Sequence, residues 1–470
     1  MVYPKKHPGG PGILLKYAGK DASAAYEPIH PPDAIQQNLV PSQCLGPLAE
    51  ISGVQEMSTE VIERTKDEIR VAQAMKERPP LSRILNLADM EKVAKSVLPH
   101  SAQAFYFAGT DDEVSLRENR RAFDRFFFHA RVMRAVRKCD PSTKILGYDS
   151  ALPLFVSGAA QASLGHPLGE LNITRGCGKS NIIQMVCGFA SVSRAEIAAA
   201  ALPSQTLFLQ LYRTRNEEAT VNLIQEAERL GYKAIFLTVD AVVVGNRERD
   251  VRSIWDLEKE EGKNRYYEEG DGEEEINLLG KSSFANRNDG LDADMSWELT
   301  IPWLRSVTKL PIILKGIQCV QDAVLAAEMK VDGILLSNHG GRQLEYAMPP
   351  LEVLFQLRQR RPDVFDGLEV YIDGELLECF SNINFQDIIR RRYTARNRFA
   401  FHRATAVGLG RPFLFALSAY GEAGVAKIVS ILQREIVTSM QLLGAASLRD
   451  LTPKLVERVD WEPVKREYKL

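Results

Sequence analysis

Residues 311–338 have the sequence PIILKGIQCVQDAVLAAEMKVDGILLSN, and this stretch contains the pattern that decides the fold. Two short apolar runs, 311–315 and 332–338, flank a segment with the apolar spacing of a helix. Near-continuous apolar runs of this length are typical of strands buried on both faces of a parallel sheet. The stretch therefore predicts one strand–helix–strand unit.

Further runs of the same kind alternate with helical stretches on both sides of this unit. They are LPLFVSG (152–158), NIIQMVC (181–187), TLFLQLY (206–212), AIFLTVD (234–240), LEVYID (368–373) and TAVGLG (405–410). With the first two, they make eight runs, which predict an α/β protein folded as a (β/α)8 TIM barrel. A doubly wound open sheet is the alternative, although no GxGxxG follows the first run.

The composition excludes several classes of protein. The 470 residues carry a formal net charge of −2, which gives no overall attraction to nucleic acid. No apolar run approaches the roughly 18–20 residues that a spanning helix needs, so we expect no membrane span. The six cysteines are scattered without metal-ligand spacing, which predicts free thiols.

The chain divides into three predicted parts. We expect a small N-terminal unit over 1–45, a linker over 46–80 and the barrel domain over 81–470. Residues 254–296 are rich in Glu, Asp, Lys and Gly and predict a long polar loop. No targeting segment is visible at the N-terminus, which by itself predicts a cytoplasmic protein.

His7 and His30 each stand in a turn sequence, HPGG and EPIHPP. On their spacing alone, they are either two surface histidines or the two axial ligands of a haem iron.

Polar residues stand at or just after the carboxyl ends of the predicted strands, where TIM-barrel active sites lie. They are Ser157, Cys187, Gln210, Tyr212, Thr238, Asp240, Lys315, Ser337, His339, Arg342, Asp373, Gly410 and Arg411. A guanidinium can bind a carboxylate through two parallel hydrogen bonds, and an imidazole beside it can remove a proton from the adjoining carbon or hydroxyl. SNHGGRQ (337–343) supplies both groups. Asp240 can orient the histidine, and Lys315 suits a developing anion on a flavin ring.

The motifs SNHGGRQ, QLY, TVDA, LPIILKG and GLGRPFL resemble those of the FMN-dependent 2-hydroxy acid dehydrogenases and oxidases. HPGG followed by AGKDASAAYEPIHPP resembles the haem-binding core of a cytochrome b5-like domain. Together they are most similar to the flavocytochrome b2 type, the L-lactate dehydrogenases that reduce cytochrome c. The resemblance implies an FMN-binding TIM barrel preceded by a truncated cytochrome b5-like α+β fragment, with His7 and His30 as ligands of haem b.

The resemblance also implies an activity and its residues. A lactate-like L-2-hydroxy acid would be oxidised, with electrons passed through haem to cytochrome c, in a homotetramer of the mitochondrial intermembrane space. His339 would be the base, paired with Asp240, and Arg342 would bind the substrate carboxylate with Arg247 and Tyr212. The residues implied to contact FMN are Ser157, Cys187, Gln210, Thr238, Lys315, Ser337, Asp373, Gly410 and Arg411. The alternatives are an oxidase that uses oxygen and a catalytically impaired flavin-binding homologue.

The chain departs from the family pattern at several positions. Phe105 stands where the family has a tyrosine, Ala159 replaces a threonine and Cys187 replaces a serine, while Phe189 would line the pocket for the substrate side chain. Residues 375–403 lack the family's glycine–arginine motif and carry six arginines among aromatic residues. A nucleic-acid patch is conceivable there, but matching flanks favour a translated intron or a frameshift, which predicts weakened FMN binding.

Overall fold

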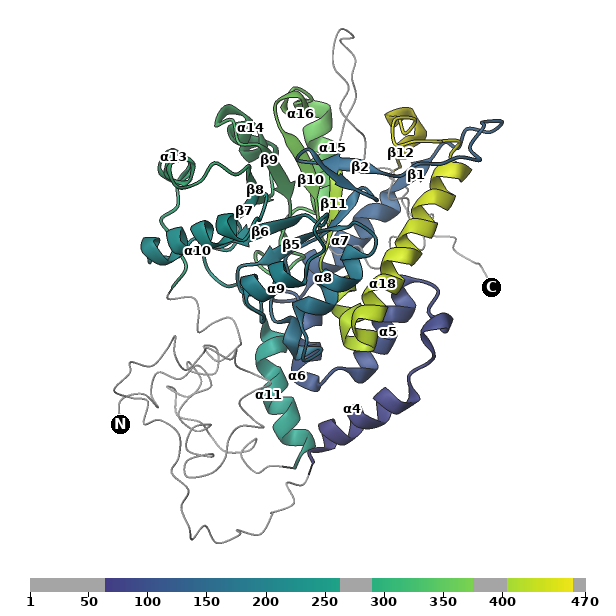
Figure 1. Cartoon of the computed structure of the whole chain (residues 1–470), viewed down its shortest axis with the longest axis vertical. Coiled ribbons are helices and arrows are strands. Elements are labelled where there is room, and N and C mark those ends of the chain that lie inside the picture. The colour runs from purple at the N-terminus through teal and green to yellow at the C-terminus, as the bar shows by residue number, and fades with distance from the viewer. Residues whose placement is uncertain (1–63, 263–289, 375–403, 460–470) are drawn as a thin grey trace, which may run out of the picture.

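Eight parallel strands close into a barrel in the computed structural model, which describes residues 64–262, 290–374 and 404–459 (Figure 1). The strands are β4 (Leu154–Val156), β5 (Ile183–Cys187), β6 (Leu207–Leu211), β7 (Ile235–Thr238), β8 (Ile312–Ile317), β9 (Gly333–Leu336), β10 (Glu369–Ile372) and β11 (Ala404–Leu409). Strand β11 pairs with β4 and closes the ring. The TIM barrel predicted from the sequence is confirmed.

The parallel register brings the polar strand ends together. Thr238 is the partner of Lys315 across β7 and β8, and Cys187 is the partner of Gln210 across β5 and β6. The carboxyl ends of all eight strands meet at one rim, so residues far apart in the sequence can share one site there.

Large side chains fill the interior of the barrel. Phe155, Phe208, Phe236 and Tyr371 are fully buried and pack against one another with ring centroids 5.5–6.0 Å apart. The hairpin of β2 (Thr143–Ile145) and β3 (Tyr148–Ser150) adds Ile145 to the same cluster. The interior is therefore a packed core that leaves no room for a ligand inside the ring of strands.

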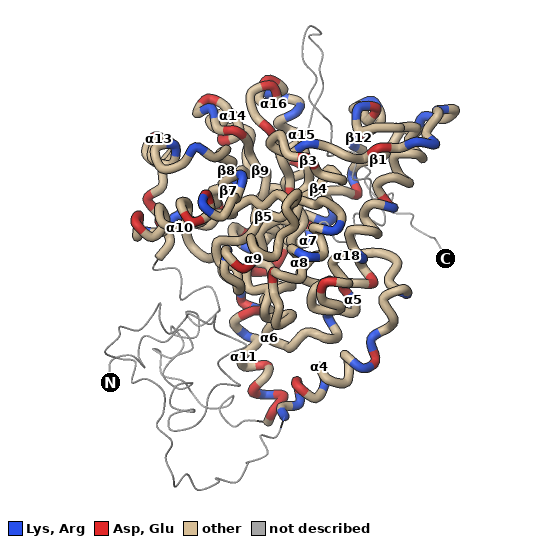
Figure 2. The backbone as a smooth tube through the Cα atoms, viewed as in Figure 1, with Lys and Arg blue, Asp and Glu red and all other residues tan. Residues whose placement is uncertain are grey.

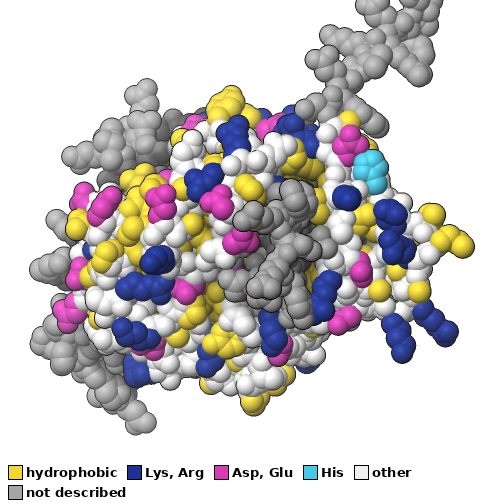
Figure 3. Space-filling view, turned by 90° about the horizontal axis from the view of Figure 1, so that it is seen from above, with side chains coloured by type: hydrophobic (Ala, Val, Ile, Leu, Met, Phe, Trp, Pro, Cys, Tyr) yellow, Lys and Arg dark blue, Asp and Glu magenta, His cyan; other side chains and the backbone are white. Residues whose placement is uncertain are grey.

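Helices surround the strands and bury a second, larger apolar core against them (Figure 1). They are α8 (Glu170–Gly178), α9 (Arg194–Ala200), α10 (Glu217–Arg229), α11 (Glu248–Glu260), α13 (Trp297–Val307), α14 (Val320–Glu328), α15 (Pro350–Arg360), α16 (Val364–Gly367) and α18 (Arg411–Leu442). Lys, Arg, Asp and Glu are interspersed along this outer layer (Figure 2). The face seen from above Figure 1 likewise mixes both signs of charge (Figure 3).

Further elements lie outside the eightfold pattern. They are α4 (Lys66–Glu77), α5 (Leu87–Val97), α6 (His100–Phe107), α7 (Val114–Arg121), and the antiparallel pair β1 (Phe126–Phe128) and β12 (Val456–Arg458), with short 3-10 turns at Leu81–Arg83, Ala122–Arg125, Ala162–Leu164 and Pro453–Leu455. Phe105 lies in the last turn of α6, next to the barrel rim.

Helix α18 is long and apolar enough to cross a bilayer by length and composition. In this structure 67% of its most apolar window is buried, because it packs against α5 and α8. The helix bends at Tyr420 and Gly421, where the backbone leaves helical geometry. Burial against neighbouring helices identifies α18 as a core helix of the barrel domain.

The structure corrects one boundary predicted from sequence. The prediction of a polar loop over 254–296 is wrong at its start, because residues 254–260 form the end of helix α11. Polar residues with high helix propensity extend this helix, and Arg252 pairs with Glu248 one turn earlier. The predicted units at 1–45 and 375–403, including His7 and His30, lie outside the described residues. The predicted linker, 46–80, contains helix α4 in its described part.

Candidate active site

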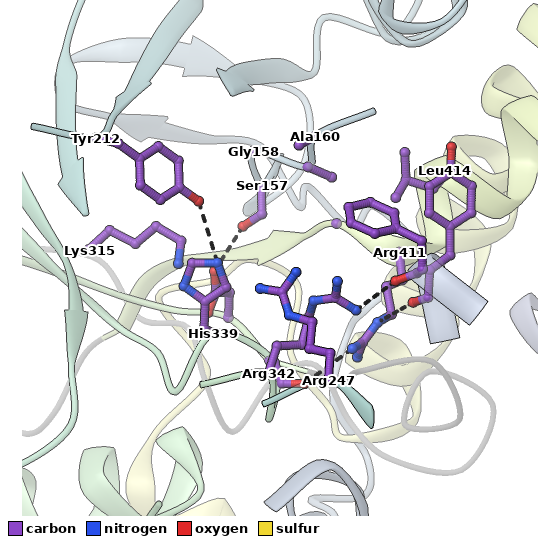
Figure 4. Close-up of a pocket in the computed structure, with 17 residues that line it drawn as sticks. Ser157, Gly158, Ala160, Tyr212, Arg247, Lys315, His339, Arg342, Arg411 and Leu414 are labelled. Carbon is purple, nitrogen blue, oxygen red and sulfur yellow. Dashed lines mark hydrogen bonds between the residues drawn. The ribbon is translucent and has the colours of Figure 1, made fainter. Parts of the chain in front are cut away.

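A pocket lies at the carboxyl ends of the strands, at the rim predicted from the sequence (Figure 4). It encloses about 750 Å³ of empty space, including its open mouth. Of the residues predicted to form the site, those that line it are Ser157, Tyr212, Arg247, Lys315, His339, Arg342, Asp373, Gly410 and Arg411. Asp240, Gln210, Thr238 and Ser337 are buried behind this lining and are hydrogen-bonded within it.

The turn after β9 positions His339 through a left-handed backbone. His339, Gly340 and Gly341 have φ values of 57°, 66° and 70°, and the His339 N–H donates to Ser337 Oγ at 3.0 Å. A Cβ on Gly341 would lie 2.5 Å from the Leu116 nitrogen. Glycine is therefore required at 341 by both its backbone conformation and its neighbour.

His339 and Asp240 form a pair in which the carboxylate is buried and the imidazole is partly exposed to the pocket. Their Nδ1 and Oδ1 atoms lie 2.9 Å apart, and the Asp240 side chain has no exposed surface. The neighbouring glycine, Gly316, leaves room for this carboxylate, since a Cβ there would lie 2.4 Å from Asp240 Cγ. Lys315 Nζ lies 3.9 Å from Asp240 Oδ2. A carboxylate acceptor at Nδ1 fixes the proton on that atom and leaves the Nε2 lone pair directed toward Tyr212 and the pocket.

The charges around the pair set its protonation. Burial lowers the pKa of His339 below its ordinary value, and the Lys315 ammonium lowers it further, while Asp240 opposes both. Burial would raise the pKa of Asp240, but Lys315 and His339 outweigh it and hold the pKa below its usual value. At neutral pH the site therefore holds an ionised carboxylate and a neutral imidazole, which can accept a proton.

Tyr212 belongs to a chain of side-chain hydrogen bonds. Gln210 Nε2 donates to the Tyr212 hydroxyl at 3.0 Å and to Thr238 Oγ1 at 3.1 Å. The Tyr212 hydroxyl lies 3.4 Å from His339 Nε2. Burial, followed by the nearby Cys187 and Asp240, raises the pKa of Tyr212 well above its ordinary value, so the hydroxyl stays protonated.

Three guanidinium groups gather on the other side of His339 from Lys315 and Tyr212 (Figure 4). Arg342 Nη1 donates to the Phe105 and Ala108 carbonyls at 2.8 and 2.7 Å, and its guanidinium lies 5.1 Å from the Phe105 ring. Burial, together with Arg247 and Arg411, holds the pKa of Arg342 well below its usual value. Three clustered cations repel one another, so this side of the pocket favours an anionic ligand.

Asp250 is a member of this cluster that sequence reasoning missed. It is 7% exposed, one Oδ atom has no hydrogen-bond partner among the described residues, and burial raises its pKa against the effects of Arg342 and Arg247. Its position three residues after Arg247, in the first turn of α11, is the only sequence signal that could have found it. Phe105, Tyr106, Ala160, Gly374 and Leu414 also line the pocket without having been assigned a role.

The donor and acceptor groups of the pocket fit FMN. Gln210 Oε1 and Asp373 Oδ1 are buried and have no hydrogen-bond partner among the described residues, so both can accept from a ligand. Ser157 Oγ donates to the other Asp373 oxygen at 3.2 Å. Gly410 and Arg411 start helix α18, and a helix N-terminus with a guanidinium suits a phosphate. Gln210 Oε1 therefore suits the edge of the flavin ring, and Asp373 suits the ribityl hydroxyls. Gly410 and Arg411 suit the phosphate.

Cys187, predicted to contact the flavin, does not line the pocket either. Cys187 is 2% exposed, accepts from the Phe189 N–H at 3.4 Å and clusters with Tyr212, Ala241 and Leu291. The ring of Phe189 stacks on that of Tyr212 at 4.8 Å. Cys187 therefore supports the wall behind Tyr212.

Two family models match the chain. The FMN-dependent dehydrogenase model covers residues 94–378 and 402–458, and the cytochrome b5-like heme/steroid binding domain model covers residues 2–49. The interruption of the first match falls within the unusual segment 375–403.

Individual relatives are similar to most of the chain. The L-lactate dehydrogenase (cytochrome) of Wickerhamomyces anomalus is 38% identical over 457 residues, which cover 96% of this chain and 74% of that protein. Human 2-hydroxyacid oxidase 1 is 34% identical and covers 80% of this chain and 98% of its own length. The recombinant flavin-binding domain of baker's yeast flavocytochrome b2 superimposes with a TM-score of 0.70 at 37% identity, covering 84% of this chain and 91% of that one.

Proposed function

Because the chain belongs to the FMN-dependent dehydrogenase family, we propose that its barrel oxidises an L-2-hydroxy acid to the corresponding 2-oxo acid. The observation that carries this proposal is that His339, paired with the buried Asp240 carboxylate, lines one pocket with the Arg342 guanidinium. A base and a carboxylate-binding group are the two protein groups that this oxidation needs. Lactate is the first candidate substrate, because two relatives of 38% identity are L-lactate dehydrogenases.

In this proposal Arg342 and Arg247 bind the substrate carboxylate. Their mutual repulsion in a buried site is relieved when an anion arrives. The protonated Tyr212 hydroxyl donates a further hydrogen bond to the substrate. Together these contacts hold the carbon that bears the hydroxyl beside His339.

His339 Nε2 then accepts a proton from the substrate. Asp240 stabilises the imidazolium that results, because its carboxylate already accepts from Nδ1 at 2.9 Å. FMN, when bound, takes the two electrons from the substrate, and Lys315 places a fixed cation next to this centre. We assign FMN binding to Gln210, Thr238, Lys315, Ser337, Ser157 and Asp373 around the ring and ribityl chain, and to Gly410 and Arg411 at the phosphate end.

For the electron acceptor we propose haem b in the N-terminal segment, and then cytochrome c. The support is the cytochrome b5-like match over residues 2–49 and the likeness to L-lactate dehydrogenases (cytochrome) over 96% of the chain. In this proposal His7 and His30 are the axial ligands of the iron. Oxygen is the second candidate acceptor, since oxidases of Arabidopsis thaliana and human are 36% and 34% identical to this chain.

Turnover of the FMN-loaded full chain tests both parts of the proposal. With L-lactate we expect the 2-oxo acid and reduced cytochrome c, and little peroxide in air. Peroxide formed in proportion to turnover would assign oxygen as the acceptor. Absence of any 2-oxo acid with lactate, glycolate and mandelate would overturn the proposed activity itself.

We further propose a homotetramer in the mitochondrial intermembrane space, by analogy with haem-fused members of the family. Sedimentation velocity of the full chain and fractionation of the source cells test these two statements separately.

A further inference from the structure

Gln343 follows Arg342 directly, and its side chain points away from the substrate pocket into a neighbouring loop. That loop, residues 240–247, begins with Asp240 at the end of β7 and ends with Arg247 at the start of α11. Gln343 is 9% exposed and does not line the pocket. The chemistry proposed above gives it no role.

All three hydrogen bonds of the Gln343 amide go to this one loop. Its Nε2 donates to the Asp240 carbonyl at 3.1 Å and to the Val243 carbonyl at 2.7 Å. Its Oε1 accepts from the Gly245 N–H at 3.0 Å. Two carbonyls and one N–H as partners define the orientation of the amide, so only an amide of this length satisfies all three.

The two segments also meet backbone to backbone. A Cβ on Gly245 would lie 2.4 Å from the Arg342 carbonyl oxygen and 2.7 Å from Gln343 Cα. At its far end the loop is tied to residues 110 and 111, since Asp111 N–H donates to the Asn246 carbonyl at 2.8 Å. Val243, in the middle of the loop, is 59% exposed. Gln343 therefore anchors the first half of the loop by its side chain, while Asn246 near the far end is held separately by Thr110 and Asp111.

We propose that Gln343 is a positioning residue that holds the Asp240–Arg247 loop in register with the turn carrying His339 and Arg342. This inference rests on the proposed function, because it concerns the same substrate and the same base. Four groups of the site come from these two segments, Asp240 and Arg247 from one and His339 and Arg342 from the other. The Gln343 amide fixes the distance between these segments.

Substitution of Gln343 tests the inference. Gln343→Met keeps the volume but removes all three hydrogen bonds, and Gln343→Glu sets a carboxylate oxygen against two carbonyls. A displacement of about 1 Å at a catalytic site can cost about 10²-fold in rate. We expect kcat/KM to fall by about that factor in both variants, with KM raised through Arg247 and the acidic limb of the pH profile moved through Asp240. Gln321→Met and Gln321→Glu, on the exposed surface of α14, are the matched controls and should behave as wild type.

Hydrogen exchange supplies a readout that does not depend on activity. In Gln343→Met, amides of residues 240–247 should exchange faster while those of the barrel strands are unchanged. Wild-type exchange in this loop, or kcat/KM within about twofold of wild type, would overturn the inference. Uniformly faster exchange across the strands would also overturn it, because the role would then be general stability. If the wild-type chain oxidises no 2-hydroxy acid, the proposed function fails while the exchange experiment still decides whether Gln343 anchors the loop.

Discussion

Asp240 Oδ1 lies 2.9 Å from His339 Nδ1, and the carboxylate is fully shielded from solvent. The next charge, Lys315 Nζ, lies 3.9 Å from the other carboxylate oxygen. Asp240 therefore balances one permanent cation and one histidine that gains charge when it accepts a proton. A substitution of His339 therefore removes the proton acceptor, whereas a substitution of Asp240 changes the charge beside that acceptor.

Asp240→Asn should change the pH dependence in a defined direction. The base must be neutral, so kcat/KM falls as the pH drops through the pKa of His339, which burial and Lys315 hold below about 6.5. Asp240 is the group that raises this pKa, so its neutralisation should move the acidic limb to still lower pH. The plateau should fall by about 10²-fold, because the imidazolium loses its counter-charge. A pH profile of kcat/KM measures both effects, and an unmoved limb contradicts the assignment.

Arg342→Met should raise KM for the hydroxy acid. Hydrogen bonds to charged groups contribute about 1.5–3 kcal/mol, which corresponds to a loss of about 10- to 100-fold in binding. Arg305→Met, which breaks a half-exposed pair with Asp332 on the surface, is the matched control and should leave KM unchanged. Titration with a 2-oxo acid in place of substrate gives the same comparison without turnover. Equal affinity in both variants argues against carboxylate binding by Arg342.

Phe105→Tyr should lower KM. The Phe105 ring lines the pocket and lies beside the Arg342 guanidinium, so a hydroxyl on its edge would add a donor near the expected carboxylate. One added hydrogen bond to a charged group should lower KM by about tenfold. Phe127→Tyr, at the exposed position of β1, should have no effect. An unchanged KM in Phe105→Tyr would place the carboxylate elsewhere in the pocket.

Glu435→Gln should stabilise the protein at alkaline pH. Burial raises the pKa of Glu435 to about 7, although Arg434 opposes the shift. The folded state therefore binds more protons than the unfolded state between about pH 4.5 and 7, and stability falls as pH rises through this window. Above it, the glutamine variant should unfold about 1–3 °C higher, with little difference near pH 5. Thermal unfolding at pH 5 and pH 8 tests this. A higher unfolding temperature of the variant only at pH 5 would contradict the predicted direction.

Much of the fold was predictable, because each barrel strand is a short apolar run whose end carries a polar residue. The pairing of Asp240 with His339 also followed from strand ends that must meet at one rim. The prediction of a polar loop from residue 254 overlooked Val251, Ile254 and Trp255, whose i, i+3, i+4 spacing is that of one apolar helix face. The contacts of Gln343 and Asp250 depend on how residues 240–250 approach the turn after β9, and no periodicity in the sequence encodes that approach.

Anaerobic rapid mixing of the FMN-loaded chain with L-lactate tests the central claim most directly. We predict that the yellow absorption of the flavin bleaches in wild type and that His339→Gln slows this step by about 10²- to 10⁴-fold. His129→Gln, at an exposed histidine paired with Glu457, should bleach at the wild-type rate. If no 2-hydroxy acid bleaches the wild-type flavin, or if His339→Gln bleaches as fast as wild type, the chain is not the dehydrogenase described here.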